Sequence, residues 1–204
     1  REEENRRHEQ ALAEIEREMN DVKTSGQSEF HKLLTAEGRD LAKSVVHALR
    51  YLEWGKVVDV FDYWKKVIRD REEDIWLMDA ESPSVEAGLR KEGLITVLVR
   101  SGKAWATDDE CGLLQKYKGR RMQEFDNTRM KAVLIGNYFS SADARTRDNP
   151  FSGVQIEEAR KDGNGLLTTY ELFKAIKAEK EGRISKAALR SQVREKAGLI
   201  TFEY

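Results

Sequence analysis

Two apolar runs constrain the fold of this chain more than any other feature. Residues 94–101 (LITVLVRS) and 131–137 (KAVLIGN) are rich in β-branched and aliphatic side chains. Short continuous runs of this kind are typical of strands buried inside a sheet. With 204 residues, of which 39% are hydrophobic, the chain is long enough to enclose one sizeable core. The sequence therefore predicts one α/β domain built around these two strands.

Hydrophobic periodicity predicts the elements around these strands. Apolar residues recur at helical spacing over 35–52, whereas 56–64 and 73–80 alternate as half-buried strands do. An Asp pair opens a further helix at 108. The later elements are expected to be helices over 154–161, 168–180 and 185–196, a short strand at 165–167 and a last strand over 199–202. The central order is thus αβββαβ, with helical additions.

The first 25 residues differ from the rest. Their apolar positions step by three or four residues, which is a heptad pattern. The seam consists of Asn5, His8, Leu12, Ile15, Met19 and Val22. We predict a helical stalk over 1–25 and a separate domain over 28–204. So few apolar residues cannot stabilise a lone helix, which leaves two arrangements open: a coiled coil that self-associates through residues 5–22, or a charged helix packed on its own domain.

Charge and composition exclude several classes of protein. The 36 Lys and Arg residues nearly cancel the 37 Asp and Glu residues, so attraction to nucleic acid must come from a local patch. No apolar window is long enough to span a membrane, and the N-terminus lacks an apolar signal region, so we expect a cytoplasmic protein. The lone Cys111 cannot form an internal disulfide or a thiolate zinc site.

From about residue 33 to the end, the chain resembles the restriction-endonuclease-like, PD-(D/E)XK superfamily of nuclease domains. Four segments carry the resemblance: LLTAEGRDLAKSVVHAL, EDIWL, ITVLVRSGK with GLLQKY, and KAVLIGNYFSSADARTRDNPF with GLLTTYELF. The resemblance implies a three-layer αβββαβ sandwich with a mixed central sheet, within a larger defence or DNA-processing protein. No membrane partner is expected.

The chemistry of that family requires hard oxygen ligands for a divalent metal. An Asp opens the second strand, and a Glu or Asp precedes a Lys by two residues on the third. Asp74 matches the first position. Leu98, Val99 and Arg100 stand where the acid, any residue and the Lys would be. Leucine offers no oxygen to a metal, and arginine does not give up its proton, so it cannot act as a general base.

The resemblance thus implies a vestigial site whose remaining candidates are Asp74, Arg100 and Gln115, with Ala42 where relatives often carry a Glu. We expect a catalytically degenerate module that needs no cofactor and that binds nucleic acid or a partner in an assembly.

Two alternatives stay open. In the first, Glu86 supplies the second carboxylate with Lys91 nearby, or a displaced acid such as Asp109 or Glu110 does so, and the chain is an active Mg²⁺-dependent nuclease with Asp74 as a metal ligand. In the second, the chain is a purely structural interaction or oligomerisation domain, and Asp74 is a strand-end acid paired with a basic neighbour.

Basic side chains near the expected site are candidates for phosphate contacts, which give affinity without sequence specificity. They are Lys116, Lys118, Arg120 and Arg121 on the helix after the third strand, and Arg145 and Arg147 in the loop after KAVLIGNYF. Interspersed acids favour the alternative of a solvated, mixed-charge surface equally well.

One further motif imitates a calcium-binding EF-hand loop. RKDGNGLLTTYEL, residues 160–172, places several ligand types at the right positions, but Arg160 occupies the first position, where its charge opposes a cation. We therefore favour a helix, a short strand and a new helix capped by Thr168 or Thr169.

Overall fold

The computed structural model describes residues 30–78 and 83–204, so the predicted stalk lies outside the described residues. In this part of the chain, six strands form one sheet in their sequence order. The strands are β1 (Lys56–Asp59), β2 (Ile75–Met78), β3 (Ile95–Ser101), β4 (Lys131–Asn137), β5 (Gly165–Thr168) and β6 (Gly198–Leu199).

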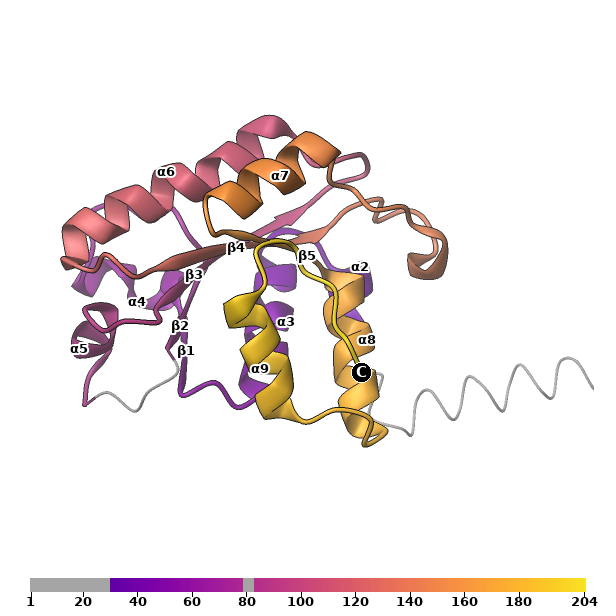
Figure 1. The fold of residues 1–204 in the computed structure, drawn as a ribbon, viewed down its shortest axis with the longest axis horizontal. Helices are drawn as coiled ribbons and strands as arrows, with labels where there is room; N and C mark the ends of the chain where they lie inside the picture. Colours follow the sequence, from indigo (N-terminus) through magenta and orange to yellow (C-terminus); the bar gives the residue numbers. More distant parts are fainter. Residues whose placement is uncertain (1–29, 79–82) are drawn as a thin grey trace, which may run out of the picture.

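Helices separate and flank these strands. They are α2 (Lys32–Thr35), α3 (Gly38–Tyr51), α4 (Val60–Tyr63), α5 (Val85–Leu89), α6 (Asp108–Phe125), α7 (Gly153–Lys161), α8 (Thr169–Lys180) and α9 (Lys186–Glu195), with short 3₁₀ turns η2 (Trp64–Lys66) and η3 (Ala144–Thr146). In Figure 1, α6 and α7 lie over one face of the sheet, and α3, α8 and α9 lie over the other.

The sheet is mixed. β1, β2 and β3 pair antiparallel, and β3 to β6 pair parallel. From α3 to β4 the elements follow the order αβββαβ, and α7, β5, α8, α9 and β6 extend the sandwich. The predicted α/β three-layer sandwich with a mixed central sheet is confirmed.

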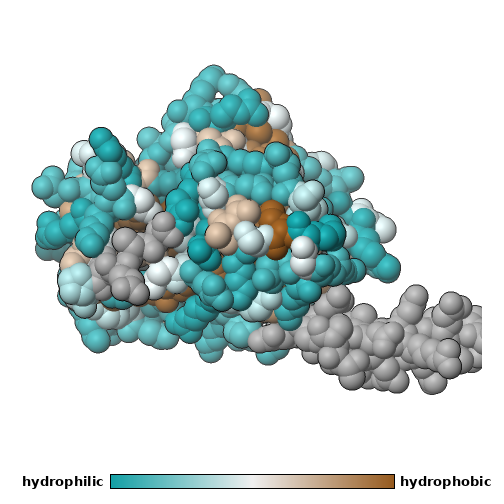
Figure 2. All heavy atoms as spheres, turned by 60° about the horizontal axis from the view of Figure 1, so that its bottom comes forward, coloured by the Kyte–Doolittle hydropathy of each residue, from teal (hydrophilic) through white to brown (hydrophobic). Residues whose placement is uncertain are grey.

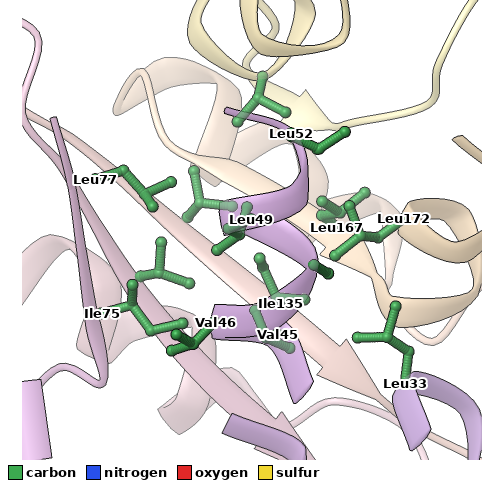
Figure 3. Packing of buried hydrophobic residues seen from close by; sticks show 14 of the residues in the cluster. Leu33, Val45, Val46, Leu49, Leu52, Ile75, Leu77, Ile135, Leu167 and Leu172 are labelled. Carbon is green, nitrogen blue, oxygen red and sulfur yellow. The ribbon is translucent and has the colours of Figure 1, made fainter. Parts of the chain in front are cut away.

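The larger cluster of buried residues lies between the sheet and α3, α8 and α9 (Figure 3). Val45 and Leu49 of α3 point towards Ile75, Leu77 and Ile135 of the strands. Each of these five side chains is at most 2% exposed. Complete burial of an aliphatic side chain contributes about 1.5–3 kcal/mol, so this interface is a main source of stability.

A second cluster fills the opposite face, between the strands and α6 and α7. Leu98, Leu134 and Leu166 of three neighbouring strands pack there with Leu114 of α6. Along β3, Val97 and Val99 belong to the first cluster while Leu98 belongs to the second, as the alternation of a strand requires. The continuous apolar run is therefore explained by a strand that is covered on both faces.

Two short helices depart from the predictions. The expected strand over 56–64 ends at Asp59, whose carboxylate accepts a hydrogen bond from the N–H of Phe61 at 3.2 Å and caps α4. In the segment after β2, Ser84 accepts from the N–H of Ala87 and caps α5, which the sequence patterns did not indicate. Helices of four or five residues are too short to show a hydrophobic period.

The EF-hand-like segment forms the helix–strand–helix that we favoured. α7 ends at Lys161, β5 pairs with β4, and the side chain of Thr168 accepts a hydrogen bond from the N–H of Glu171 to cap α8. The Glu171 carboxylate accepts from the backbone N–H of Phe202 at 3.0 Å. The motif is thus used for packing in the described structure.

The surface in Figure 2 is largely hydrophilic, with only small hydrophobic patches on the face shown. Within the described ranges, no helix has both the length and the apolar character that crossing a membrane requires.

Candidate functional site

Asp74 lies where the pairing of β2 and β3 ends. Its backbone N–H donates to the carbonyl of Val97 at 2.9 Å, one step beyond the last strand residue. Its carboxylate Oδ2 then accepts the N–H of Val99 at 2.8 Å. The side chain therefore takes the place of the next backbone acceptor and satisfies a β3 amide that would otherwise lack a partner.

Arg100 neutralises this carboxylate in part. Its Nη1 lies 3.4 Å from Oδ2 of Asp74 and donates to the carbonyl of Val99 at 2.7 Å. Burial raises the pKa of Asp74, and the Val99 N–H and the Arg100 charge oppose that rise. The two side chains are 18% and 28% exposed, so they form a partly buried ion pair.

The register of the sheet decides what faces Asp74 across the strands. Ile75 is the last β2 residue of the register and pairs with Val97, and the N–H of Asp74 donates to the carbonyl of the same Val97. Across the strands the carboxylate then contacts the N–H of Val99 and the guanidinium of Arg100. Leu98, between Val97 and Val99, is 2% exposed and packs in the cluster beneath α6.

A metal site at Asp74 would need further oxygen ligands from the protein or from water. Among residues 30–78 and 83–204, no three His, Cys, Asp or Glu side chains are grouped so that they could hold a metal ion. Asp59, which pairs opposite Ile75, is engaged by Arg39 through two contacts of 2.7 and 2.8 Å.

The structure does not bring the other site candidates to Asp74. The side-chain oxygen of Gln115 accepts from Asn164 at 3.3 Å, towards β5. Glu86 accepts from the hydroxyl of Tyr63 at 2.6 Å. Glu86 belongs to α5, which follows the end of β2 remote from Asp74, and Lys91 follows α5.

The two acids considered as displaced metal ligands, Asp109 and Glu110, lie in the first turn of α6. Glu110 forms a capping box with Thr107 at the start of α6 and also accepts from the Tyr138 hydroxyl at 3.1 Å. Asp109 lies beside it in the first helical turn.

A group of residues that the sequence patterns did not single out lies near the same sheet edge. The exposed ring of Phe61 lies between two guanidinium groups, 4.3 Å from that of Arg39 and 4.9 Å from that of Arg71. These residues are distant in the sequence and belong to no motif, so no linear signal would have found them.

Three of the six candidate phosphate-binding residues are held by contacts within the protein, two of them buried and one half-buried. Arg121 is 1% exposed, and its Nε donates to Glu73 at 2.8 Å. Lys118 is 7% exposed and donates to the carbonyl of Asp162 at 2.5 Å. Arg147 donates to four neutral oxygens, including Oδ1 of Asn137 at 2.7 Å. These three cations are engaged in internal contacts.

The other three candidates are exposed. Lys116 lies on the surface of α6, and Arg120 pairs there with Glu72. Arg145 is 79% exposed and pairs with Asp143 at 2.8 Å. Hydrogen bonds from Arg145 lower the pKa of Asp143 to about 2. The exposed candidates thus fall into two places, one on α6 and one in the turn η3.

Comparison with known proteins gives a limited result. No family model matches the chain, and no curated protein matches it. Among solved structures, restriction endonuclease FokI has 14% identity and a TM-score of 0.49, over 84% of this chain and 30% of that one. A structure of FokI bound to DNA has 13% identity and a TM-score of 0.40, over 86% and 33%. The chain thus spans about a third of the structures it resembles.

Proposed function

We propose that this chain is a catalytically degenerate nuclease-fold module that binds nucleic acid or a partner protein within a larger defence or DNA-processing protein. One observation carries the proposal: the carboxylate of Asp74 accepts the N–H of Val99 and pairs with Arg100, while Leu98 is buried beneath α6. The α/β sandwich supports the nuclease-fold part of the proposal, and the contacts of Asp74 support the loss of catalysis.

The contacts of Asp74 account for its presence without a metal. Its carboxylate completes the β2–β3 ladder, and a structural acceptor is useful in any protein with this sheet. Arg100 stands in the place of the family's lysine, and a guanidinium group offers no acceptor that could take a proton from water. A phosphodiester hydrolase built on these residues would lack both a second metal ligand and a base.

A cleavage assay tests the catalytic half of the proposal. The protein is incubated with single- and double-stranded DNA and RNA in the presence of Mg²⁺ or Mn²⁺, next to Asp74→Asn, which keeps an oxygen for Val99. We expect neither protein to cut. Cleavage by the wild type that disappears in Asp74→Asn would instead establish the active-nuclease alternative.

A binding assay tests the nucleic-acid half. Lys116 and Arg120 are the exposed cations on α6, so the combined variant Lys116→Glu, Arg120→Gln removes two phosphate contacts. In this variant, the slope of log K for DNA binding against log salt concentration should become shallower by about 2 units, because each phosphate contact contributes about 0.9. Lys43→Glu, on the surface of α3, is the matched control. The absence of salt-dependent binding would favour the purely structural interaction domain.

Self-association through the predicted stalk stays a prediction, because residues 1–25 lie outside the described residues. Light scattering of residues 1–204 and 26–204 compares the two masses directly. We expect the longer chain to be oligomeric and the shorter one monomeric. Equal monomeric masses would remove the coiled-coil hypothesis.

A further inference from the structure

A recess of about 750 Å³ opens between α2, the loop after β4, and α8. Tyr204 closes part of its rim. Neither Asp74 nor Arg100 lines it. The size falls within the range of about 300–1,000 Å³ that is usual for small-molecule sites. The recess is therefore large enough for an organic ligand, and its lining includes Arg145 and Arg147 but not the Asp74 pair.

The lining is strongly cationic. Five of its side chains carry a positive charge and two carry a negative charge, which leaves an excess of three positive charges. The cations are Arg145, Arg147, Lys174, Lys177 and Arg183, and the acids are Asp143 and Glu181. The whole chain has a formal net charge of −1, so this excess is local. A concave surface with one sign of charge concentrates ligands of the opposite sign.

Ion pairs leave part of this charge uncompensated. Arg145 pairs with Asp143 at 2.8 Å, and Arg183 and Lys177 share Glu181 at 2.7 and 3.8 Å. Lys174 pairs with Glu171 at 2.5 Å, so counting this neighbouring acid lowers the local excess to two positive charges. The hydrogen bonds of Arg147 end on three backbone carbonyls and one amide oxygen, all of them neutral. The guanidinium of Arg147 thus adds a charge that no hydrogen-bonded carboxylate cancels.

Aromatic rings lie among these cations. Tyr170, Phe173 and Tyr204 line the recess. The Lys174 ammonium lies 5.3 Å from the centre of the Tyr170 ring, and the Arg183 guanidinium lies 5.0 Å from that of Tyr204. Tyr204 is 48% exposed, so a ligand can reach it. Rings next to cations suit a ligand that has both a flat heterocycle and negative charge.

We propose that this recess binds a nucleotide that carries two or more phosphate groups. The phosphates lie against Lys174, Lys177 and Arg183, and the base stacks on Tyr204. Free phosphate would use the cations but not the ring, and an apolar ligand would use the ring but not the cations. The convergence of both on one recess favours a nucleotide over a long polymer, which needs a continuous track of cations.

Calorimetric titration of the full chain with ATP, and separately with inorganic pyrophosphate, tests the site. We expect saturable ATP binding that weakens at least about tenfold in Lys177→Glu, Arg183→Glu, because two attractive charges become repulsive. Pyrophosphate binding should weaken in the same variant. Lys43→Glu, a surface charge reversal outside the recess, should leave both affinities unchanged.

Tyr204 separates a nucleotide site from a simple anion site. Tyr204→Ala should weaken ATP binding at least about fivefold, since stacking on a ring contributes about 1 kcal/mol or more and about 1.4 kcal/mol corresponds to a factor of ten. Tyr204→Phe should retain ATP binding, and neither change should affect pyrophosphate.

Three results would overturn the proposal: no saturable heat with ATP, an ATP affinity that the double charge reversal leaves unchanged, or equal losses of ATP and pyrophosphate in Tyr204→Ala. A single-stranded oligonucleotide that binds while ATP does not would also refute it. The recess and the α6 cations involve different residues, so ATP binding and the DNA binding tested with Lys116 and Arg120 fail or succeed independently.

Discussion

Arg121 on α6 and Arg145 in η3 look alike in the sequence, since each belongs to a basic stretch interrupted by acids, but the fold treats them in opposite ways. Arg121 is 1% exposed, and its partner Glu73 is 48 residues away. Arg145 is 79% exposed, and its partner Asp143 is two residues away. The comparison teaches that a basic residue becomes structural when distant parts of the chain supply its acceptors.

The Arg121 site joins α6 to the start of β2. Arg121 also donates to the carbonyl of Asp70 at 2.5 Å and to Glu124. Glu73 is 2% exposed and accepts a second hydrogen bond from Nε1 of Trp76 at 2.6 Å. Several hydrogen bonds thus offset the large desolvation penalty of this buried pair.

The largest effect should come from breaking this site. Arg121→Met leaves the Glu73 charge buried and unpaired, so the free energy of unfolding should fall by about 3–5 kcal/mol. Urea denaturation measures the change. The combined variant Arg121→Met, Glu73→Gln should recover part of the loss, since the stranded charge is gone. A loss below about 1 kcal/mol in the single variant would contradict the structural role of Arg121.

Lys131 is a half-buried cation whose hydrogen bonds end on backbone carbonyls, and its effect on stability should depend on pH. Its Nζ donates to the carbonyls of Val193 and Arg194 at 2.7 and 3.1 Å and to that of Lys196, at the end of α9. Burial, with a smaller contribution from the charge of Lys118, lowers the pKa of Lys131 from 10.5 to about 8.

Between pH 8 and pH 10.5, Lys131 carries a proton in the unfolded chain but has lost it in the folded chain, so the free energy of unfolding should rise with pH. Relative to Lys131→Met, the wild type should gain up to about 3 kcal/mol between pH 8 and 10.5, at about 1.4 kcal/mol per pKa unit. Urea denaturation at several pH values measures the difference. A difference that does not vary with pH would show that the pKa of Lys131 is not lowered.

Substitutions of Asp74 should have a smaller effect on the free energy of unfolding. Two variants distinguish the contribution of its oxygen from that of its charge. Asp74→Ala removes the acceptor of the Val99 N–H and should lower the unfolding free energy by about 1–3 kcal/mol. Asp74→Asn keeps an oxygen and should stay within about 0.5 kcal/mol of the wild type near neutral pH.

The Asp74 pair also has a predicted pH dependence. Because burial raises the pKa of Asp74, the folded chain binds a proton at a higher pH than the unfolded chain does. The stability of the wild type relative to Asp74→Asn should therefore fall as the pH rises from 3.8 through that raised pKa. Thermal denaturation across this range measures the slope, and a slope of the opposite sign would contradict the burial of the carboxylate.

The smallest effect should come from Arg145, the exposed member of the comparison. Arg145→Gln breaks the surface pair with Asp143, so the unfolding free energy should change by less than about 0.5 kcal/mol. The same urea titration measures it. A loss comparable with that of Arg121→Met would mean that exposure does not separate the two arginines.

Much of the fold was predictable from local pattern. The hydrophobic patterns that indicated these elements are visible in the sequence itself. They are the apolar runs of β3 and β4 and the amphipathic spacing of α3. The strand expected over 56–64 was wrong beyond Asp59, because one side-chain cap turned the chain into α4. A cap changes the backbone direction without changing the hydrophobic pattern.

The site was predictable only in part. A motif located Asp74 and Arg100, and they lie together. No motif placed Gln115 beside Asn164 or gathered the cations of α8 and η3 around one recess. Such neighbours come from elements that are distant in the sequence.

By itself, the sequence determined the main strands and the longer helices and placed an aspartate at the start of the second strand, since these depend on residues a few positions apart. Only the tertiary structure decided that Arg121 is buried while Arg145 is exposed, and that the Asp74 carboxylate accepts the N–H of Val99 at the end of the ladder. The physical reason is that burial and hydrogen-bond partners are properties of packed neighbours, which a linear pattern does not contain.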